Sequence, residues 1–146
     1  MIPISFPPSN FKVRFNERTT NDEIFDVIRK KWLVLTPEEW VRQNFVNYLV
    51  SVLNYPASLI ALEKGIKVGE LSKRFDIVVY NNLAQPVLLI ECKAPDVSLN
   101  QNTIQQILSY KSVLNASYLI ITNGHFTYGF YTNNQMVEQI SEIPGF

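Results

Sequence analysis

The segment from 87 to 93, VLLIECK, is apolar at four consecutive positions. Successive side chains of a strand point to opposite faces, so an unbroken apolar run is typical of a central strand that is covered on both sides. Two other extended runs precede it, at 59 to 68 and 74 to 80, and short polar links separate the three. Such links indicate adjacent antiparallel strands. The sequence therefore predicts a sheet with other elements packed on each face.

A helix is expected before these strands. Thr36 and Pro37 are typical of an N-cap and a first helical residue, and two carboxylates, Glu38 and Glu39, follow in the first turn, where the helix dipole favours them. We expect about 17 residues of helix, ending before Pro56. One face should be buried, because these apolar residues recur at helical spacing: Trp40, Val41, Phe45, Tyr48, Leu49 and Val52.

The remaining segments complete a mixed architecture. A helical segment is expected from about 100 to 115, followed by strands at 118 to 122 and 126 to 132. The order helix, three strands, helix, strand, strand predicts an α/β chain of mixed α+β type, with a mixed sheet between helices. Residues 1–35 are predicted to be an N-terminal arm and an extended hairpin packed on a core formed by residues 36–146, as one domain overall.

Within the N-terminal region, the sequence indicates a first strand and leaves the rest open. Apolar residues alternate from Phe11 to Phe15, and the polar stretch NERTTNDE then turns the chain. A second extended segment is expected between Ile24 and Leu35. Its part IRKKWLVL fits either a strand or a helix.

Composition limits the classes of partner. The 13 Lys and Arg balance the 13 Asp and Glu, so a nucleic acid would have to be bound by a local patch. Its candidates are Lys64, Lys67, Lys73, Arg74, Lys93 and Lys111.

The single cysteine, Cys92, permits neither an internal disulfide nor a cysteine zinc cluster. With no leader and no apolar run of membrane-spanning length, we expect a cytoplasmic protein without membrane contact.

Three polar residues interrupt the predicted sheet. Asp76 lies within an apolar strand, and Glu91 and Lys93 end the next strand two residues apart, so their side chains share a face. Antiparallel pairing would bring Asp76 beside them. Two close carboxylates repel each other unless a cation neutralises them, which favours a Mg²⁺ site. Cys92, between Glu91 and Lys93, should point to the opposite, apolar face as an inert core residue.

These residues carry a resemblance to a known superfamily. RFDIVVY followed by LLIECK resembles the Asp and Glu-x-Lys signature of PD-(D/E)XK nucleases, and Gln106 to Tyr110, QILSY, resembles the Gln-x-x-x-Tyr element of type I restriction subunits and related recombination nucleases. LTPEEWVRQ, IECKAP and YLIITNG are also similar to the N-terminal domain of the type I restriction enzyme R subunit. The resemblance covers roughly residues 23 to 132, and Phe75 stands where the signature has proline.

The resemblance implies a restriction-endonuclease-like α/β/α sandwich and a set of site residues. It implies Asp76 and Glu91 as ligands of Mg²⁺, with Mn²⁺ as a substitute, and Lys93 as the catalytic lysine. Gln106 and Tyr110 would contact the site or the nucleic-acid backbone. The family often has a further glutamate in the first helix, matching Glu38 or Glu39 here. The helical wheel favours Glu38, which falls near the apolar stripe, whereas Glu39 falls outside it.

Two functions from different classes are compatible with this pattern. The first is a metal-dependent endonuclease that hydrolyses DNA phosphodiester bonds. The alternative is a catalytically silent DNA-binding or docking module for a separate helicase, translocase or methyltransferase subunit. RNA as the substrate remains open, as does the oligomeric state. The 146 residues contain no ATP-binding motor sequence, so we expect no translocation by this chain itself.

Overall fold

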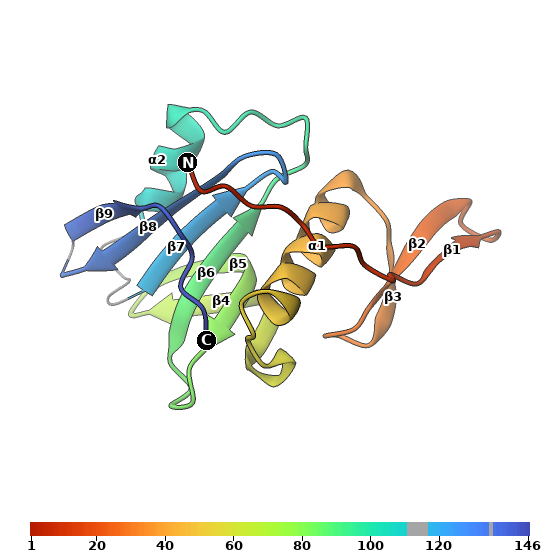
Figure 1. The fold of residues 1–146 in the computed structure, drawn as a ribbon, viewed down its shortest axis with the longest axis horizontal. Helices are drawn as coiled ribbons and strands as arrows, with labels where there is room; N and C mark the ends of the chain where they lie inside the picture. The colour runs from red at the N-terminus through yellow and green to blue at the C-terminus, as the bar shows by residue number, and fades with distance from the viewer. Residues whose placement is uncertain (111–116, 135) are drawn as a thin grey trace.

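The centre of the structure, a computed structural model, is a six-stranded mixed sheet (Figure 1). The structure describes residues 1–110, 117–134 and 136–146. Strands β4 to β9 lie side by side in sequence order, and all neighbours are antiparallel except the parallel pair β6 and β7. Their bounds are β4 Ile60–Val68, β5 Leu71–Tyr80, β6 Pro86–Cys92, β7 Ser117–Thr122, β8 Thr127–Asn133 and β9 Met136–Ile140.

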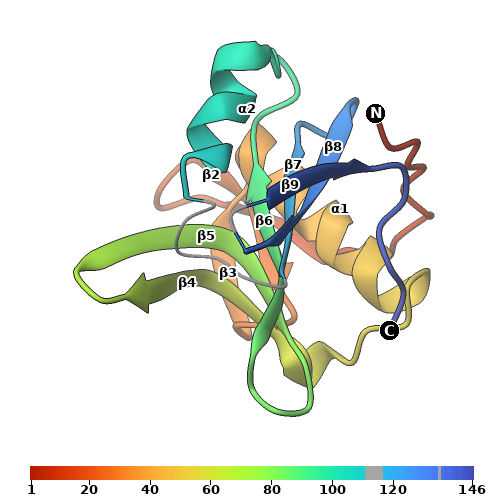
Figure 2. The same cartoon turned by 90° about the vertical axis from the view of Figure 1, so that its left-hand side faces the viewer.

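Helices cover both faces of this sheet (Figure 2). Helix α1, Pro37–Ser51, packs through Phe45 and Leu49 against one face, and helix α2, Gln101–Leu108, packs through Ile107 against the other. Burial of the apolar face of each element holds the layers together. The predicted α/β/α sandwich is therefore confirmed, as is β6 as its central strand, with apolar side chains buried on both faces.

Helix α1 begins where the sequence predicted. The Thr36 side chain accepts a hydrogen bond from the backbone N–H of Glu39 at 3.0 Å, and Pro37 is the first helical residue. The predicted apolar face is wrong at two positions: Trp40 is 44% exposed and Val52 is 45% exposed. Trp40 lies at the edge of the buried stripe, where its ring contacts that of Phe11 in the N-terminal arm.

Replacing Thr36 by alanine is expected to destabilise the protein by about 1 kcal/mol, because it removes the side-chain acceptor for an otherwise unpaired helical N–H. Chemical denaturation of both proteins measures this difference. Thr36→Ser keeps the hydroxyl oxygen and should retain most of the stability. Equal stability of the alanine and threonine proteins would show that water satisfies this N–H equally well.

Helix α2 forms the crossover between the parallel strands β6 and β7. It is shorter than the predicted segment from 100 to 115, because Ser109 and Tyr110 form a turn. There the Tyr110 N–H bonds to the carbonyl of Ile107 at 3.3 Å, and the Ser109 hydroxyl donates to the carbonyl of Gln106 at 2.6 Å. Residues 111–115 of the prediction lie outside the described residues.

The N-terminal region forms a second, three-stranded antiparallel sheet beside α1 (Figure 1). The segment between Ile24 and Leu35, expected to be extended, is interrupted by a turn. The Asp26 carboxylate accepts hydrogen bonds from the backbone N–H groups of Ile28 and Arg29, which stabilises this turn. The part IRKKWLVL, which fitted either a strand or a helix, contains part of that turn and a strand. The bounds are β1 Val13–Asn16, β2 Asn21–Asp26 and β3 Lys31–Val34.

In the described part of the chain, no helix is both long enough and apolar enough to span a membrane.

Candidate functional site

A pocket of about 360 Å³ lies at the ends of β5 and β6, beneath α2. It brings together four of the predicted site residues: Glu91 near the end of β6, Lys93 just after it, Gln106 from α2, and Tyr110 from the turn that follows. Glu91 and Lys93 share this face, as the two-residue spacing predicted. The other lining residues are Lys73, Thr103, Ile107, Ser109 and Ile121.

Lys73 also lines the pocket, although the sequence predicted it only as a member of the basic patch. Its ammonium lies 3.2 Å from Oε2 of Glu91, and it also lies over the rings of Phe75 and Tyr110, 5.5 and 5.7 Å from their centroids. A protonated amine between a carboxylate and two aromatic faces is well stabilised. The pocket therefore holds two lysines, Lys73 and Lys93, around one carboxylate.

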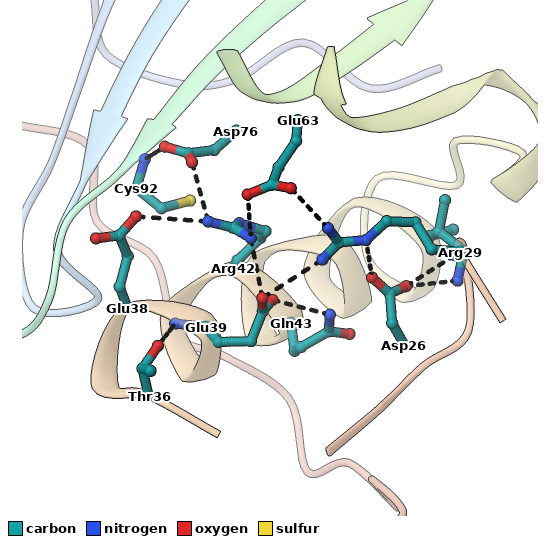
Figure 3. A network of polar contacts seen from close by, with 11 residues as sticks. Asp26, Arg29, Thr36, Glu38, Glu39, Arg42, Gln43, Glu63, Asp76 and Cys92 are labelled. Atoms are coloured by element: carbon teal, nitrogen blue, oxygen red, sulfur yellow. Dashed lines mark hydrogen bonds and ion pairs between the residues drawn. The ribbon is translucent and has the colours of Figure 1, made fainter. Parts of the chain in front are cut away.

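Asp76 lies beside Glu91 but is directed differently. The register pairs Ile77 with Ile90, which puts Asp76 and Glu91 next to each other on β5 and β6. The Asp76 carboxylate is outside the pocket lining. Its Oδ1 lies 3.0 Å from the Arg42 guanidinium of α1, and its Oδ2 accepts a hydrogen bond from the backbone N–H of Cys92 at 2.7 Å (Figure 3).

An irregularity in the sheet accompanies this direction of Asp76. On β4, Leu62 pairs with Ile77 and Lys64 pairs with Phe75, so Glu63 and Asp76 stand between these pairs. Glu63 has φ of +50°, a left-handed conformation that disfavours residues other than glycine. Residues held in such conformations cluster at functional sites.

The electrostatics around Glu91 are unfavourable for its ionised form. Burial raises the pKa of Glu91, and the negative charge of Asp76 raises it further, while Lys73 and Lys93 act in the opposite direction. The net shift is upward. A carboxylate pair with this residual repulsion would be stabilised by an additional cation.

Cys92 is buried in the core on the α1 side of the sheet, as predicted from its place between Glu91 and Lys93. Burial, together with the charge of Asp76, raises the pKa of the Cys92 thiol well above its ordinary value. The thiol form is therefore maintained at neutral pH, which agrees with an inert core residue.

The helical wheel predicted the wrong glutamate of α1 to face the core. Glu39, expected outside the inward stripe, is 7% exposed, whereas the side chain of Glu38 is 46% exposed. Glu39 accepts hydrogen bonds from Arg42 at 2.9 Å and from Gln43 at 3.1 Å. Glu38 lies 3.4 Å from the same Arg42 Nη2 that holds Asp76, whereas Glu39 contacts Nη1 of that guanidinium. Its role as a metal ligand remains a prediction.

The donor groups fit Mg²⁺ in chemistry and number. Among the described residues, no group of three or more His, Cys, Asp or Glu side chains is arranged to hold a metal ion. Mg²⁺ is commonly bound through only one or two carboxylates, with waters and substrate phosphates completing its octahedron. Asp76 and Glu91 offer two such carboxylates, and burial together with the charge of Asp76 raises the pKa of Glu91.

Most candidates for the basic patch lie on the hairpin formed by β4 and β5 (Figure 2). Lys64, Lys67 and Arg74 are exposed there, and Lys73 faces the pocket. Lys111 lies outside the described residues. Binding of nucleic acid by this patch remains a prediction.

Most of the chain matches a known protein family. Residues 37–144 match the family described as the N terminus of the type I restriction enzyme R protein. A crystal structure of a candidate nuclease belonging to DUF820, from Anabaena variabilis, is similar with a TM-score of 0.46 and 18% sequence identity, covering 82% of this chain and 76% of that one. None of the curated proteins matches the sequence.

Proposed function

This chain belongs to the family of type I restriction enzyme R protein N termini, and from that premise we propose that it is a metal-dependent nuclease that hydrolyses DNA phosphodiester bonds. One observation carries the proposal: Glu91, Lys93, Gln106 and Tyr110 line one pocket, and Asp76 stands next to Glu91. A carboxylate pair, a cation and polar side chains around one cavity are the groups that phosphodiester hydrolysis requires.

Each residue has a separate role in this proposal. Asp76 and Glu91 hold Mg²⁺, or Mn²⁺ in its place. When bound, the ion would supply Lewis-acid stabilisation of the phosphate and would activate the attacking water. Lys93 donates hydrogen bonds to the negative charge that develops on the phosphate oxygens, because its ammonium has three N–H donors and no lone pair.

The residues of α2 and its following turn position the substrate. Gln106 and Tyr110 offer an amide and a phenol in the same pocket as Glu91 and Lys93. Such neutral polar groups contact phosphate and sugar without reading sequence. The exposed lysines of the β4–β5 hairpin extend this contact to neighbouring phosphates.

Purified protein is expected to convert supercoiled plasmid to nicked or linear forms with Mg²⁺ or Mn²⁺, and to lose this activity in EDTA. Gln106→Ala should slow the reaction by about tenfold or less, mainly through weaker substrate binding, because a single neutral contact contributes about 1 kcal/mol. Gel assays over a range of DNA concentrations separate the effects on kcat and KM.

The same assay distinguishes the docking module from the nuclease. A wild-type protein that binds DNA but cuts neither plasmid, single-stranded DNA nor RNA with any divalent metal would support a silent scaffold for a separate translocase or methyltransferase subunit. Cleavage of RNA alone would keep the chemistry and change the substrate.

A further inference from the structure

Arg42 lies at the centre of a cluster of carboxylates between α1 and strands β4 and β5 (Figure 3). Its Nη1 lies 2.9 Å from Glu39 and 3.6 Å from Glu63, and its Nη2 lies 3.0 Å from Asp76 and 3.4 Å from Glu38. The side chain is only 7% exposed. Its buried Nε has no hydrogen-bond partner among the described residues, so the guanidinium is held through the two nitrogens that face the carboxylates.

A second arginine supports the carboxylates around Arg42 without touching Asp76 in any contact described. Arg29, from the turn between β2 and β3, lies 3.4 Å from Glu39 and 3.0 Å from Glu63, and it also pairs with the fully buried Asp26. Arg29 and Arg42 thus share Glu39 and Glu63. The N-terminal sheet thereby contributes a charge to the network that ends at Asp76.

Both oxygens of Asp76 are already engaged, Oδ1 by Arg42 and Oδ2 by the N–H of Cys92. A carboxylate offers about four lone-pair positions, so an oxygen of Asp76 can still coordinate a metal. A guanidinium cannot lose its charge by deprotonation within a protein. A divalent ion that approaches Asp76 therefore meets a fixed positive charge, and burial leaves little solvent to screen the repulsion.

We infer that Arg42 is the counter-ion of Asp76 in the metal-free protein and sets the metal affinity of the site. A divalent metal that binds Asp76 must either displace the Arg42 guanidinium or bind beside it. The inference rests on the proposed function, since it concerns the same carboxylates. Arg42 is a positioning residue here. It holds Asp76 in place in the metal-free protein and weakens metal binding through its positive charge. The negative charge of bound DNA offsets that positive charge, so the metal and DNA are bound most favourably together.

The test measures Mn²⁺ affinity by calorimetry, without DNA and at fixed ionic strength. Arg42→Gln is expected to bind Mn²⁺ about tenfold more tightly than the wild type, because one neighbouring charge commonly changes the proton affinity of a carboxylate by a factor of about ten or more. Adding Asp76→Asn to this variant should remove the gain. Circular dichroism checks that each protein is folded.

Arg29→Gln is the matched control. It removes the other guanidinium that contacts Glu39 and Glu63 but leaves the contact of Arg42 with Asp76. Its Mn²⁺ affinity should stay within about twofold of the wild type. Arg42→Lys keeps the positive charge and should also stay near the wild-type affinity. A purely structural role for Arg42 predicts weaker binding in both Arg42 variants.

If Arg42→Gln does not fold, the double variant with Glu39→Gln removes one charge of each sign from the network, and the same tightening is expected of it. Equal or weaker Mn²⁺ binding by the folded variant, with normal binding by the wild type, overturns the inference and leaves the proposed nuclease intact. Binding by the variant alone supports the inference. Absence of binding in both overturns the inference and the metal site together.

Discussion

Lys93→Ala is expected to lower the rate of DNA cleavage by a factor on the order of 10² or more, the usual effect of losing one donor that stabilises transition-state charge. Lys93 follows the last residue of β6 and lines the same pocket as Glu91. An ammonium has no lone pair to donate and cannot be a metal ligand. Metal affinity should therefore be almost unchanged, and the loss should fall on the chemical step.

Single-turnover cleavage at saturating Mg²⁺, with a parallel Mn²⁺ titration, measures both parts of this prediction. Lys31→Ala is the control for general loss of charge, because Lys31 is exposed on β3 in the N-terminal sheet, outside both the pocket and the β4–β5 hairpin. Lys73→Ala tests whether either pocket lysine can supply the charge. Since Lys73 is paired with Glu91, we expect a smaller fall in rate from its loss. Equal rates for Lys93→Ala and the wild type would contradict the assignment.

The layered fold could be predicted because burial is strong and regular in its central elements. Strand β6 is apolar on both faces, and α1 has both an N-cap at Thr36 and an apolar face. Strand β9, Met136–Ile140, was not predicted. It lies at the edge of the sheet and none of its side chains is fully buried, so its sequence lacks the alternation that marks a half-buried strand.

The network around Arg42 could not be predicted for a different reason. A helical wheel ranks positions by apolar neighbours along one helix, and it therefore placed Glu39 outside the buried face. Glu39 is buried because Arg29 and Arg42 both contact it, and Arg29 comes from the separate N-terminal sheet. Such burial of a charge depends on tertiary partners, which no local pattern contains.

The candidate site was only partly accessible to sequence reasoning. The two-residue spacing of Glu91 and Lys93 fixed their common face, because it depends on strand geometry alone. The pairing of Lys73 with Glu91 was missed. So was the direction of Asp76 toward Arg42, since Asp76 lies opposite Glu63, where the regular pairing of β4 and β5 is interrupted. An irregularity of this kind changes which face a side chain occupies, and periodicity cannot locate it.

Glu91→Gln is expected to abolish measurable metal binding and also to raise the melting temperature of the metal-free protein at neutral pH. Burial, and next the charge of Asp76, raise the pKa of Glu91 above its ordinary value of 4.5. The folded protein therefore binds this proton more tightly than the unfolded chain does, so ionisation of Glu91 lowers stability. Glutamine keeps the size and polarity of the side chain and removes the negative charge next to Asp76.

The pH dependence of this effect follows from the direction of the shift. Below the unfolded-state pKa, Glu91 is protonated in both states and its charge has no cost, so wild type and variant should melt alike. As pH rises through the raised pKa of the folded state, the wild type alone acquires the charge, and its stability should fall relative to that of the variant. Thermal unfolding from pH 4 to pH 8 measures this divergence, with Glu70→Gln in the exposed β4–β5 turn as the control.

Metal should reverse the order of the two proteins. Mn²⁺ is expected to bind only the folded wild type, so it should raise the wild-type melting temperature with concentration and leave that of Glu91→Gln unchanged. A variant that melts below the metal-free wild type at neutral pH would show that the ion pair with Lys73 outweighs burial and the repulsion by Asp76. If Glu91→Gln is instead more stable than the wild type and also fails to bind metal, then the Glu91 side chain lowers the stability of the metal-free protein and is required for metal binding.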